Sequence, residues 1–329
     1  MNFSQLMGLA SGHVEARIVQ TAIELRIFDA LGAEPKTADA LAQLLRLETQ
    51  ATELLLNALA GLNLLNKEAD LFSLAEVAKQ YLLQKSPHYV GAMIQFDAAL
   101  WSCWEKLSDA LRTGKAVRPP NMYQAVAAET ETFINAMDSL VKARGDADVL
   151  ASAIDWNGVH TLLDVGSGPA TYPIALCRRF TNLNATIFDL PATLKITERF
   201  VHDAAMTDRI ELIAGDYRND PIPGVYDVIF LSNIIHGENE EKNTALVSKL
   251  AANLNSAGRL IIKDHILDET RANPPVGAIF SVLMLLTTDG GRCYSFGEIT
   301  AWMNNAGLNR VQRVDLPAPL TSSLVIGIK

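Results

Sequence analysis

The sequence predicts an α/β protein in which a mainly helical domain, residues 1–150, precedes a domain built on an open, mostly parallel β-sheet, residues 151–329. Three observations support this prediction. The first 150 residues contain apolar positions at helical spacing. From Trp156 onward, apolar runs of strand length alternate with helical segments, which is typical of a parallel sheet covered on both faces. A length of 329 residues also exceeds the usual size of a single hydrophobic core.

The N-terminal domain is predicted to be a winged helix. Three helices are expected, at 14–31, after the N-cap residue Thr37, and at 49–59. The short apolar stretches 62–65 and 71–74 flank a polar turn and indicate a β-hairpin, which would form the wing.

A winged helix raises a DNA-binding regulator as one alternative. The expected recognition helix, 49–59, carries Glu53 and no Lys or Arg, whereas a helix that enters the major groove presents basic and amide side chains. The formal net charge of −9 also argues against a clustered basic face. Dimerisation is the favoured use, because segments 9–30 and 89–111 carry more apolar surface than one small domain needs. We therefore expect no nucleic-acid partner.

The C-terminal domain is expected to contain a parallel sheet with a hairpin at its end. The sequence Pro317-Ala318-Pro319 between the last two predicted strands indicates this hairpin, and hence an antiparallel edge strand. A helix at 295–306 precedes the hairpin. The predicted strands are 161–165, 184–189, 210–214, 226–232, 259–265, 310–315 and 322–329.

Composition indicates a cytoplasmic protein without a membrane partner. The longest apolar candidate, 276–286, is about three helical turns and is expected to be a buried helix. The N-terminus lacks a basic flank followed by an apolar core, so no signal peptide is predicted. Cys103, Cys177 and Cys293 are odd in number and widely spaced, which suits a reducing compartment and gives no zinc or disulfide framework.

Three predicted strand ends carry residues suited to an adenine nucleoside, because ligands of open α/β sheets bind beyond the carboxyl ends of the strands. Gly166 and Gly168 follow the first strand and let the backbone approach a ligand closely. Asp189 ends the second strand, where a carboxylate accepts hydrogen bonds from ribose hydroxyls. Asp216 and Tyr217 follow the third, where an acid suits an adenine amine and an aromatic ring suits the face of the base.

Two other interpretations of these residues are open. An NAD site has similar geometry, but its fingerprint needs a third glycine where the helix packs on the strand, and this chain has GSGPAT at 166–171. Pro169 also removes one N–H from the turn that would hold a diphosphate. The remaining interpretation is that the acids only cap helices.

The combination of LDVGSG at 163–168, FDLP at 188–191, GDY at 215–217 and LSNIIH at 231–236 resembles the plant-type O-methyltransferase family. That family includes the caffeate, hydroxyindole and acetylserotonin enzymes and many bacterial small-molecule methyltransferases. The likeness covers nearly the whole chain. It implies a Rossmann-like class I methyltransferase domain, S-adenosyl-L-methionine as cofactor and S-adenosyl-L-homocysteine as product. It also implies a homodimer, formed through the N-terminal winged-helix domain, in which that domain helps to close the partner's substrate pocket.

The resemblance also implies roles for individual residues. His236 becomes the general base, and Asp264, at the end of the fifth strand, becomes the acid that orients it. The residues expected to line the acceptor pocket are Phe133, Met137, Phe280 and Met284. The expected cofactor contacts are Asp164, Gly166, Ser167, Gly168, Asp189, Leu190, Asp216, Tyr217, Ser232 and Asn233.

Three departures from the family pattern concern the chemistry. The usual His-Asp-Trp is His236-Gly237-Glu238 here, a common lysine four residues before the histidine is Ser232, and Cys293 replaces a second catalytic glutamate. We expect Cys293 to be a small apolar filler, and Glu238 to be either a solvated acid or a substitute for the missing one. Some relatives bind the cofactor but catalyse decarboxylation or hydroxylation, so a non-methylating enzyme is an alternative. The expected reaction is metal-independent methyl transfer to a small hydroxylated, aromatic acceptor.

Overall fold

The computed structural model describes residues 1–121 and 123–329. Packing divides the chain into two compact units, Met1–Leu100 and Trp101–Lys329. The helices between 101 and 150 therefore belong with the second unit, whereas the sequence analysis placed them in the first domain. Their apolar side chains explain the difference, because Val141 and Leu150 share a hydrophobic cluster with Leu162 of the sheet.

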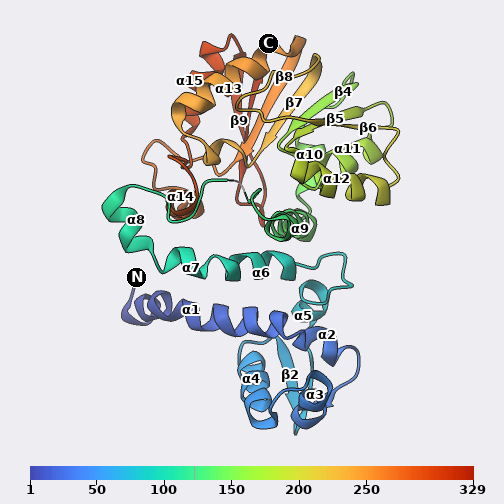
Figure 1. Cartoon of the computed structure of the whole chain (residues 1–329), viewed down its shortest axis with the longest axis vertical. Helices are drawn as coiled ribbons and strands as arrows, with labels where there is room; N and C mark the ends of the chain where they lie inside the picture. The colour runs from blue at the N-terminus through green and yellow to red at the C-terminus, as the bar shows by residue number, and fades with distance from the viewer. Residues whose placement is uncertain (122) are drawn as a thin grey trace. The chain divides into compact units, whose positions relative to one another are not determined.

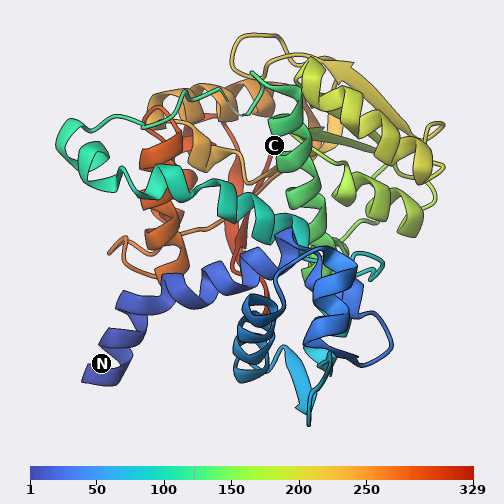
Figure 2. The same ribbon diagram turned by 60° about the horizontal axis from the view of Figure 1, so that its bottom comes forward.

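The first unit is mainly helical (Figures 1 and 2). It also contains a small sheet of three strands in the order β1-β3-β2. Thr37 caps the third helix as predicted, since its hydroxyl accepts a hydrogen bond from the backbone N–H of Ala40 at 3.2 Å. Phe28, Leu56 and Phe72 are at most 1% exposed and form the core. The elements are α1 (Phe3–Glu24), α2 (Ile27–Leu31), β1 (Lys36–Thr37), α3 (Ala38–Leu45), α4 (Thr49–Gly61), β2 (Leu65–Glu68), β3 (Leu71–Leu74), α5 (Glu76–Tyr81) and α6 (Gly91–Ala99).

Two predicted elements of this unit need correction. The helix predicted at 14–31 is two helices: α1 begins earlier because Asn2 and Gln5 form a capping box, and the chain breaks at Arg26, whose φ is 59°. The strand predicted at 62–65 begins only at Leu65. Leu62 is the C-cap of α4, and Asn63, which follows it, has a φ of 58°.

The second unit is built on a seven-stranded sheet in the order β6-β5-β4-β7-β8-β10-β9 (Figure 1). Strands β6, β5, β4, β7 and β8 run parallel to one another. The predicted strands 161–165, 184–189, 210–214 and 226–232 are confirmed with the predicted bounds. The parallel register aligns the strand ends, because Val165 pairs with Phe188 and Ser232 pairs with Lys263. The strands are β4 (Thr161–Val165), β5 (Asn184–Asp189), β6 (Ile210–Ala214), β7 (Tyr226–Ser232), β8 (Leu254–Asp264), β9 (Asn309–Asp315) and β10 (Ser323–Ile328).

The predicted hairpin β9–β10 is confirmed, and so is the antiparallel edge strand, because β9 forms the edge of the sheet and pairs antiparallel with β10. Strand β10 runs antiparallel to both β8 and β9 and lies between them. Its sequence SLVIGI is almost fully buried, which suits an interior position. Strand β9, NRVQRVD, places polar side chains along the outer edge, where they discourage pairing with another sheet.

Helices cover both faces of the sheet. Helices α10 (Asp146–Ala153), α11 (Thr171–Arg179) and α12 (Pro191–Asp203) cover one face, and α13 (Glu240–Ala252) and α15 (Phe296–Asn305) cover the other. The remaining helices are α7 (Trp101–Trp104), α8 (Leu107–Thr113), α9 (Ala127–Arg144), η1 (Ile235–Gly237) and α14 (Pro275–Thr287).

Helix α14 corresponds to the apolar segment that was expected to be a buried helix. It is only half-buried, and Ile279 on it is 65% exposed. Among the helices that the structure describes, none has the length and apolarity needed to cross a bilayer.

The centre of the sheet should dominate the stability of the second unit. Val228 of β7 is 0% exposed, and Val225, just before the same strand, is 58% exposed. We expect Val228→Ala to cost about 2 kcal/mol through lost burial and the cavity left behind. That cost corresponds to a melting temperature lower by roughly 4–8 °C in a unit of this size. Val225→Ala is the matched control and should shift the melting temperature little. Equal shifts for the two variants would contradict this account of the core.

Candidate active site

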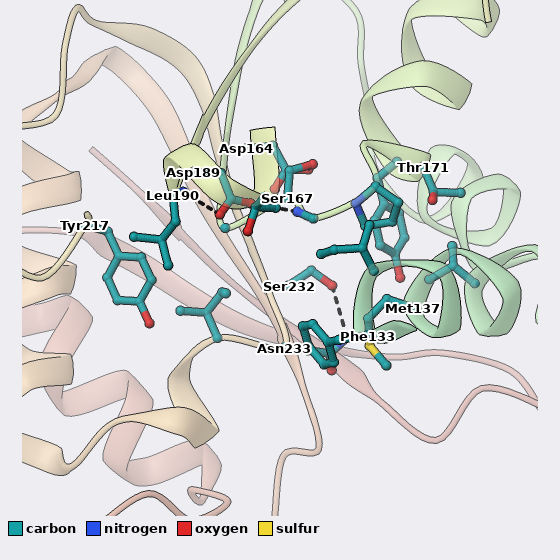
Figure 3. Close-up of a pocket in the computed structure, with 18 of the residues that line it drawn as sticks. Phe133, Met137, Asp164, Ser167, Thr171, Asp189, Leu190, Tyr217, Ser232 and Asn233 are labelled. Carbon is teal, nitrogen blue, oxygen red and sulfur yellow. Dashed lines mark hydrogen bonds between the residues drawn. The ribbon is translucent and has the colours of Figure 1, made fainter. Parts of the chain in front are cut away.

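A pocket with an empty volume of about 900 Å³, open to solvent, lies at the carboxyl ends of the parallel strands. The residues at its wall lie at or just after the carboxyl ends of β4, β5, β6 and β7, on α9, α11 and α12, or, for Gln124, shortly before α9. Figure 3 shows the carboxylates of Asp164 and Asp189 close together at one end of the pocket, with Tyr217 to one side. The lining residues are Gln124, Phe133, Ile134, Met137, Val141, Asp164, Gly166, Ser167, Gly168, Pro169, Thr171, Tyr172, Asp189, Leu190, Thr193, Tyr217, Arg218, Ser232, Asn233 and Ile234.

The glycine turn after β4 is shaped by backbone requirements. Gly166 has a φ of 67°, which strains any other residue, and a Cβ added there would lie 2.5 Å from Cδ1 of Ile234, whose side chain would have to move. The backbone N–H of Gly168 donates to Oδ2 of Asp189 at 2.8 Å, and the N–H of Leu190 donates to Oδ1 at 2.7 Å. These bonds fix the Asp189 carboxylate against the turn, at the edge of the pocket.

Burial dominates the electrostatics of the two acids. It raises the pKa of Asp164 to about 7, with a further contribution from the nearby charge of Asp189, although a hydrogen bond from Ser167 works in the opposite direction. Burial also raises the pKa of Asp189 to about 6, against the hydrogen bonds from Gly168 and Leu190. Among the described residues, Oδ1 of Asp164 is buried and has no hydrogen-bond partner. At the acidic end of the pocket, one carboxylate oxygen, Oδ1 of Asp164, is therefore left unused by the part of the chain that the structure describes.

Of the two residues in the turn after β6 that were predicted to contact the cofactor, only Tyr217 lies at the pocket. Tyr217 lines the pocket, and its hydroxyl donates to Oε1 of Glu238 at 3.1 Å. Asp216 is not among the described lining residues. Its carboxylate accepts hydrogen bonds from the backbone N–H of Arg218 at 3.0 Å and from Nδ2 of Asn219 at 3.1 Å. Its contact with an adenine amine stays a prediction.

A buried ionic cluster supports the opposite wall and was missed by the sequence analysis. Lys263 is 0% exposed, and its Nζ lies 3.2 Å from Oδ2 of Asp146, without the geometry of a hydrogen bond. Arg144 binds the same carboxylate through two nitrogens at 3.0 and 2.7 Å, and the Tyr172 hydroxyl donates to it at 3.1 Å. Tyr172 and Ser232 then form the pocket wall. A lysine that follows the buried apolar run Leu260-Ile261-Ile262 of one strand indicates a paired charge, and this signal was available in the sequence.

His236 and Asp264 form a close pair on the adjoining strand ends. Nδ1 of His236 lies 2.8 Å from Oδ1 of Asp264, and the two side chains are 12% and 2% exposed. Burial alone would raise the pKa of Asp264. The charge of His236, with hydrogen bonds from His236 and from the backbone of His265, outweighs that effect and holds the pKa below its usual range. An ionised Asp264 accepts a hydrogen bond from Nδ1–H of His236, and in the neutral imidazole this tautomer leaves the lone pair on Nε2.

The four predicted acceptor residues lie in two places. Phe133 and Met137 of α9 line the pocket. The ring of Phe280 on α14 packs edge-on against His236 with ring centroids 4.8 Å apart, and Met284 is buried. Cys293 is also buried, and burial raises the pKa of its thiol to about 12, which agrees with an apolar filler.

Metal-binding chemistry has no visible basis in the described part of the chain. Within residues 1–121 and 123–329, no three His, Cys, Asp or Glu side chains are grouped so that they could hold a metal ion.

Comparison with known proteins identifies the family. The family described as the O-methyltransferase domain matches residues 104–309, and the O-methyltransferase dimerisation domain matches residues 7–84. The chain belongs to the O-methyltransferase family. The family that the sequence motifs indicated is thus confirmed, and so is the Rossmann-like domain with a helical N-terminal dimerisation domain.

Individual relatives in this O-methyltransferase family match over almost their whole length. The 3-hydroxy-5-methyl-1-naphthoate 3-O-methyltransferase of Streptomyces sahachiroi is 31% identical over 98% of this chain and 94% of its own. The tetracenomycin polyketide synthesis 8-O-methyl transferase of Streptomyces glaucescens is 29% identical over 98% of this chain and 96% of its own. The crystal structure of human N-acetylserotonin methyltransferase in complex with SAM shares the fold, with a TM-score of 0.90, 22% identity, and coverage of 99% of this chain and 97% of that one.

The raised pKa of Asp164 should make the stability of the ligand-free protein depend on pH. The folded-state pKa of about 7 lies above the unfolded value of about 3.9. The folded chain therefore holds this proton more tightly, and stability is lost as the pH rises from 4 to 7. Asp164→Asn removes that loss. We expect the melting temperature of the variant, relative to wild type, to rise by a few degrees across this pH range and to level off above pH 7.

The control for this pH series is Asp203→Asn, because the Asp203 side chain is 81% exposed. Its melting temperature relative to wild type should not change with pH. A constant difference between Asp164→Asn and wild type from pH 4 to 7 would contradict the raised pKa.

Proposed function

We propose that this protein transfers the methyl group of S-adenosyl-L-methionine to the hydroxyl of a small aromatic acceptor, with His236 as general base. The observation that carries the proposal is the His236–Asp264 pair, with Nδ1 and Oδ1 2.8 Å apart. His236 follows Ile234 by two residues, and Ile234 lines the same pocket as Asp164 and Asp189. The relatives support the acceptor class, since one is named for a hydroxynaphthoate and another for a polyketide 8-hydroxyl.

The residues of the pocket fit an S-adenosyl nucleoside. Carboxylates accept hydrogen bonds from ribose hydroxyls, and Asp189 offers one at the end of β5. Oδ1 of Asp164 has no hydrogen-bond partner among the described residues, and burial raises the pKa of both Asp164 and Asp189. A ligand that carries hydrogen-bond donors and a positive charge would stabilise the ionised form of these carboxylates. Tyr217 offers an aromatic ring to the base. When bound, S-adenosyl-L-methionine supplies a methyl group on a sulfonium and leaves as the thioether S-adenosyl-L-homocysteine.

The chain contributes alignment and proton removal. The acceptor hydroxyl loses its proton to Nε2 of His236 as its oxygen bonds to the methyl carbon, and the positive charge moves from the ligand to the imidazole. Asp264 stabilises the imidazolium and holds the ring orientation. Phe133, Met137 and the Phe280 ring, which packs on His236, supply apolar surface for a flat acceptor.

The proposed assembly is a homodimer formed through the first unit. The match to the dimerisation domain at residues 7–84 supports it, as does the unpartnered apolar surface of α1. Leu6, Leu9 and Val14 on this helix are 54%, 70% and 50% exposed. Several exposed apolar side chains on one helix favour an interface. We retain the predictions that the protein is cytoplasmic and that no nucleic acid is a partner.

His236→Gln tests the general base. The loss of the proton acceptor should lower kcat by roughly 10²- to 10⁴-fold, while the Kd for S-adenosyl-L-homocysteine should stay within about twofold of wild type because the variant does not touch the nucleoside. Turnover is measured as S-adenosyl-L-homocysteine formed with a panel of hydroxylated naphthoates. His265→Gln is the control, since its ring bonds to the Thr321 carbonyl at 3.0 Å. Undiminished turnover in His236→Gln would remove the assignment.

Asp189→Ala tests the cofactor end and should have the reverse effect. Loss of the carboxylate should weaken S-adenosyl-L-homocysteine binding at least about tenfold, or 1.4 kcal/mol, while kcat at saturating cofactor should fall less. Calorimetry gives the Kd for S-adenosyl-L-homocysteine. Asp203→Ala is the matched control, because the Asp203 side chain is exposed. An unchanged Kd would show that this pocket does not hold the nucleoside.

A further inference from the structure

Glu238 is not the solvated acid that the sequence analysis considered. Its side chain is only 6% exposed. Nε of Arg218 lies 3.0 Å from its Oε1, the Tyr217 hydroxyl donates to the same oxygen at 3.1 Å, and Nζ of Lys242 lies 3.5 Å from Oε2. A carboxylate with these partners is held in one place.

The backbone of Glu238 is fixed as firmly as its side chain. Its carbonyl oxygen accepts hydrogen bonds from the Tyr294 hydroxyl at 2.6 Å and from Nδ2 of Asn243 at 3.2 Å. Glu238 follows η1, which carries His236, and its carboxylate reaches the turn after β6. The residue therefore connects the turn of the proposed base with the nucleoside end of the pocket.

Arg218 is the partner that faces the ligand space. It lines the pocket beside Tyr217, and its side chain is 29% exposed. A second carboxylate, Asp216, lies 3.6 Å from its Nε. Burial lowers the pKa of Arg218, but the neighbouring Tyr217 and Glu238 outweigh this and raise it, so the guanidinium stays charged. Both carboxylates contact its Nε, and its guanidinium carbon lies 5.5 Å from the centroid of the Tyr217 ring, so the planar group is held beside the aromatic ring that lines the pocket.

We propose that Arg218 is a purine-recognition residue of the cofactor pocket and that Glu238 is its positioning residue. This inference rests on the proposed function. The acids of the pocket only accept hydrogen bonds, which suits ribose hydroxyls, whereas the ring nitrogens and π-face of a purine suit a planar donor. Glu238 also balances the charge of Arg218, so that a cation at the pocket wall does not repel a sulfonium ligand.

Binding of S-adenosyl-L-homocysteine to Arg218→Met, Arg218→Lys, Glu238→Gln and the double variant, measured by calorimetry, tests the inference. We expect Arg218→Met to weaken binding at least about tenfold, and Arg218→Lys to weaken it less. Glu238→Gln should also weaken binding, and Arg218→Met/Glu238→Gln should be no weaker than Arg218→Met alone, because Glu238 acts through Arg218. The control is Arg199→Met, which breaks an exposed ion pair in which a terminal guanidinium nitrogen of Arg199 lies 2.6 Å from Oε1 of Glu131. This variant should not change the Kd.

Adenosine, titrated as a competitor, identifies which part of the ligand Arg218 contacts. Arg218→Met should lose the same fold in affinity for adenosine as for S-adenosyl-L-homocysteine. Wild-type affinity in Arg218→Met, or a loss confined to S-adenosyl-L-homocysteine, would overturn the inference while leaving the proposed function intact. Failure of the wild type itself to bind S-adenosyl-L-homocysteine would remove both. If circular dichroism shows that Glu238→Gln does not fold, the two Arg218 variants decide the result.

Discussion

The parallel register of β4, β5, β7 and β8 is the constraint on which the rest of the site depends. Backbone pairing of Val165 with Phe188 and of Ser232 with Lys263 makes these strands end along one edge of the sheet. Residues that are far apart in the sequence therefore meet there, because parallel strands share the direction in which they end. The glycine turn, both pocket acids and the histidine pair all follow from this alignment.

Burial of charge at this edge determines what each acid does. Carboxylates removed from water are costly unless they are paired, and three of them have basic partners in His236, Arg218 and Lys263. Asp164 and Asp189 differ, since neither has a basic partner among residues 1–121 and 123–329, and the pKa of each is raised. The paired acids build and orient the site. The unpaired ones are the groups that a ligand with hydroxyl donors and a positive charge completes.

The sequence predicted the sheet well and the polar network poorly. Strand β7 was predicted because its apolar run is continuous and bounded by turn residues. The position of β10 between β8 and β9 was not predicted, because strand order depends on which edge the last hairpin meets, and local pattern does not encode it. Glu238 and Lys263 were missed or misjudged for a related reason: whether a charged residue is solvated or buried depends on partners from distant elements. Asp264 was found only because the family resemblance supplied its role.

The central claim is that the acidic end of the pocket holds the nucleoside of the methyl donor. A crystal structure of the protein with S-adenosyl-L-homocysteine tests it most directly. The account predicts both ribose hydroxyls within hydrogen-bond distance of the Asp189 carboxylate and the sulfur on the side of the pocket nearest His236. A bound nucleoside that leaves Asp189 in contact only with the backbone of Gly168 and Leu190 would contradict it.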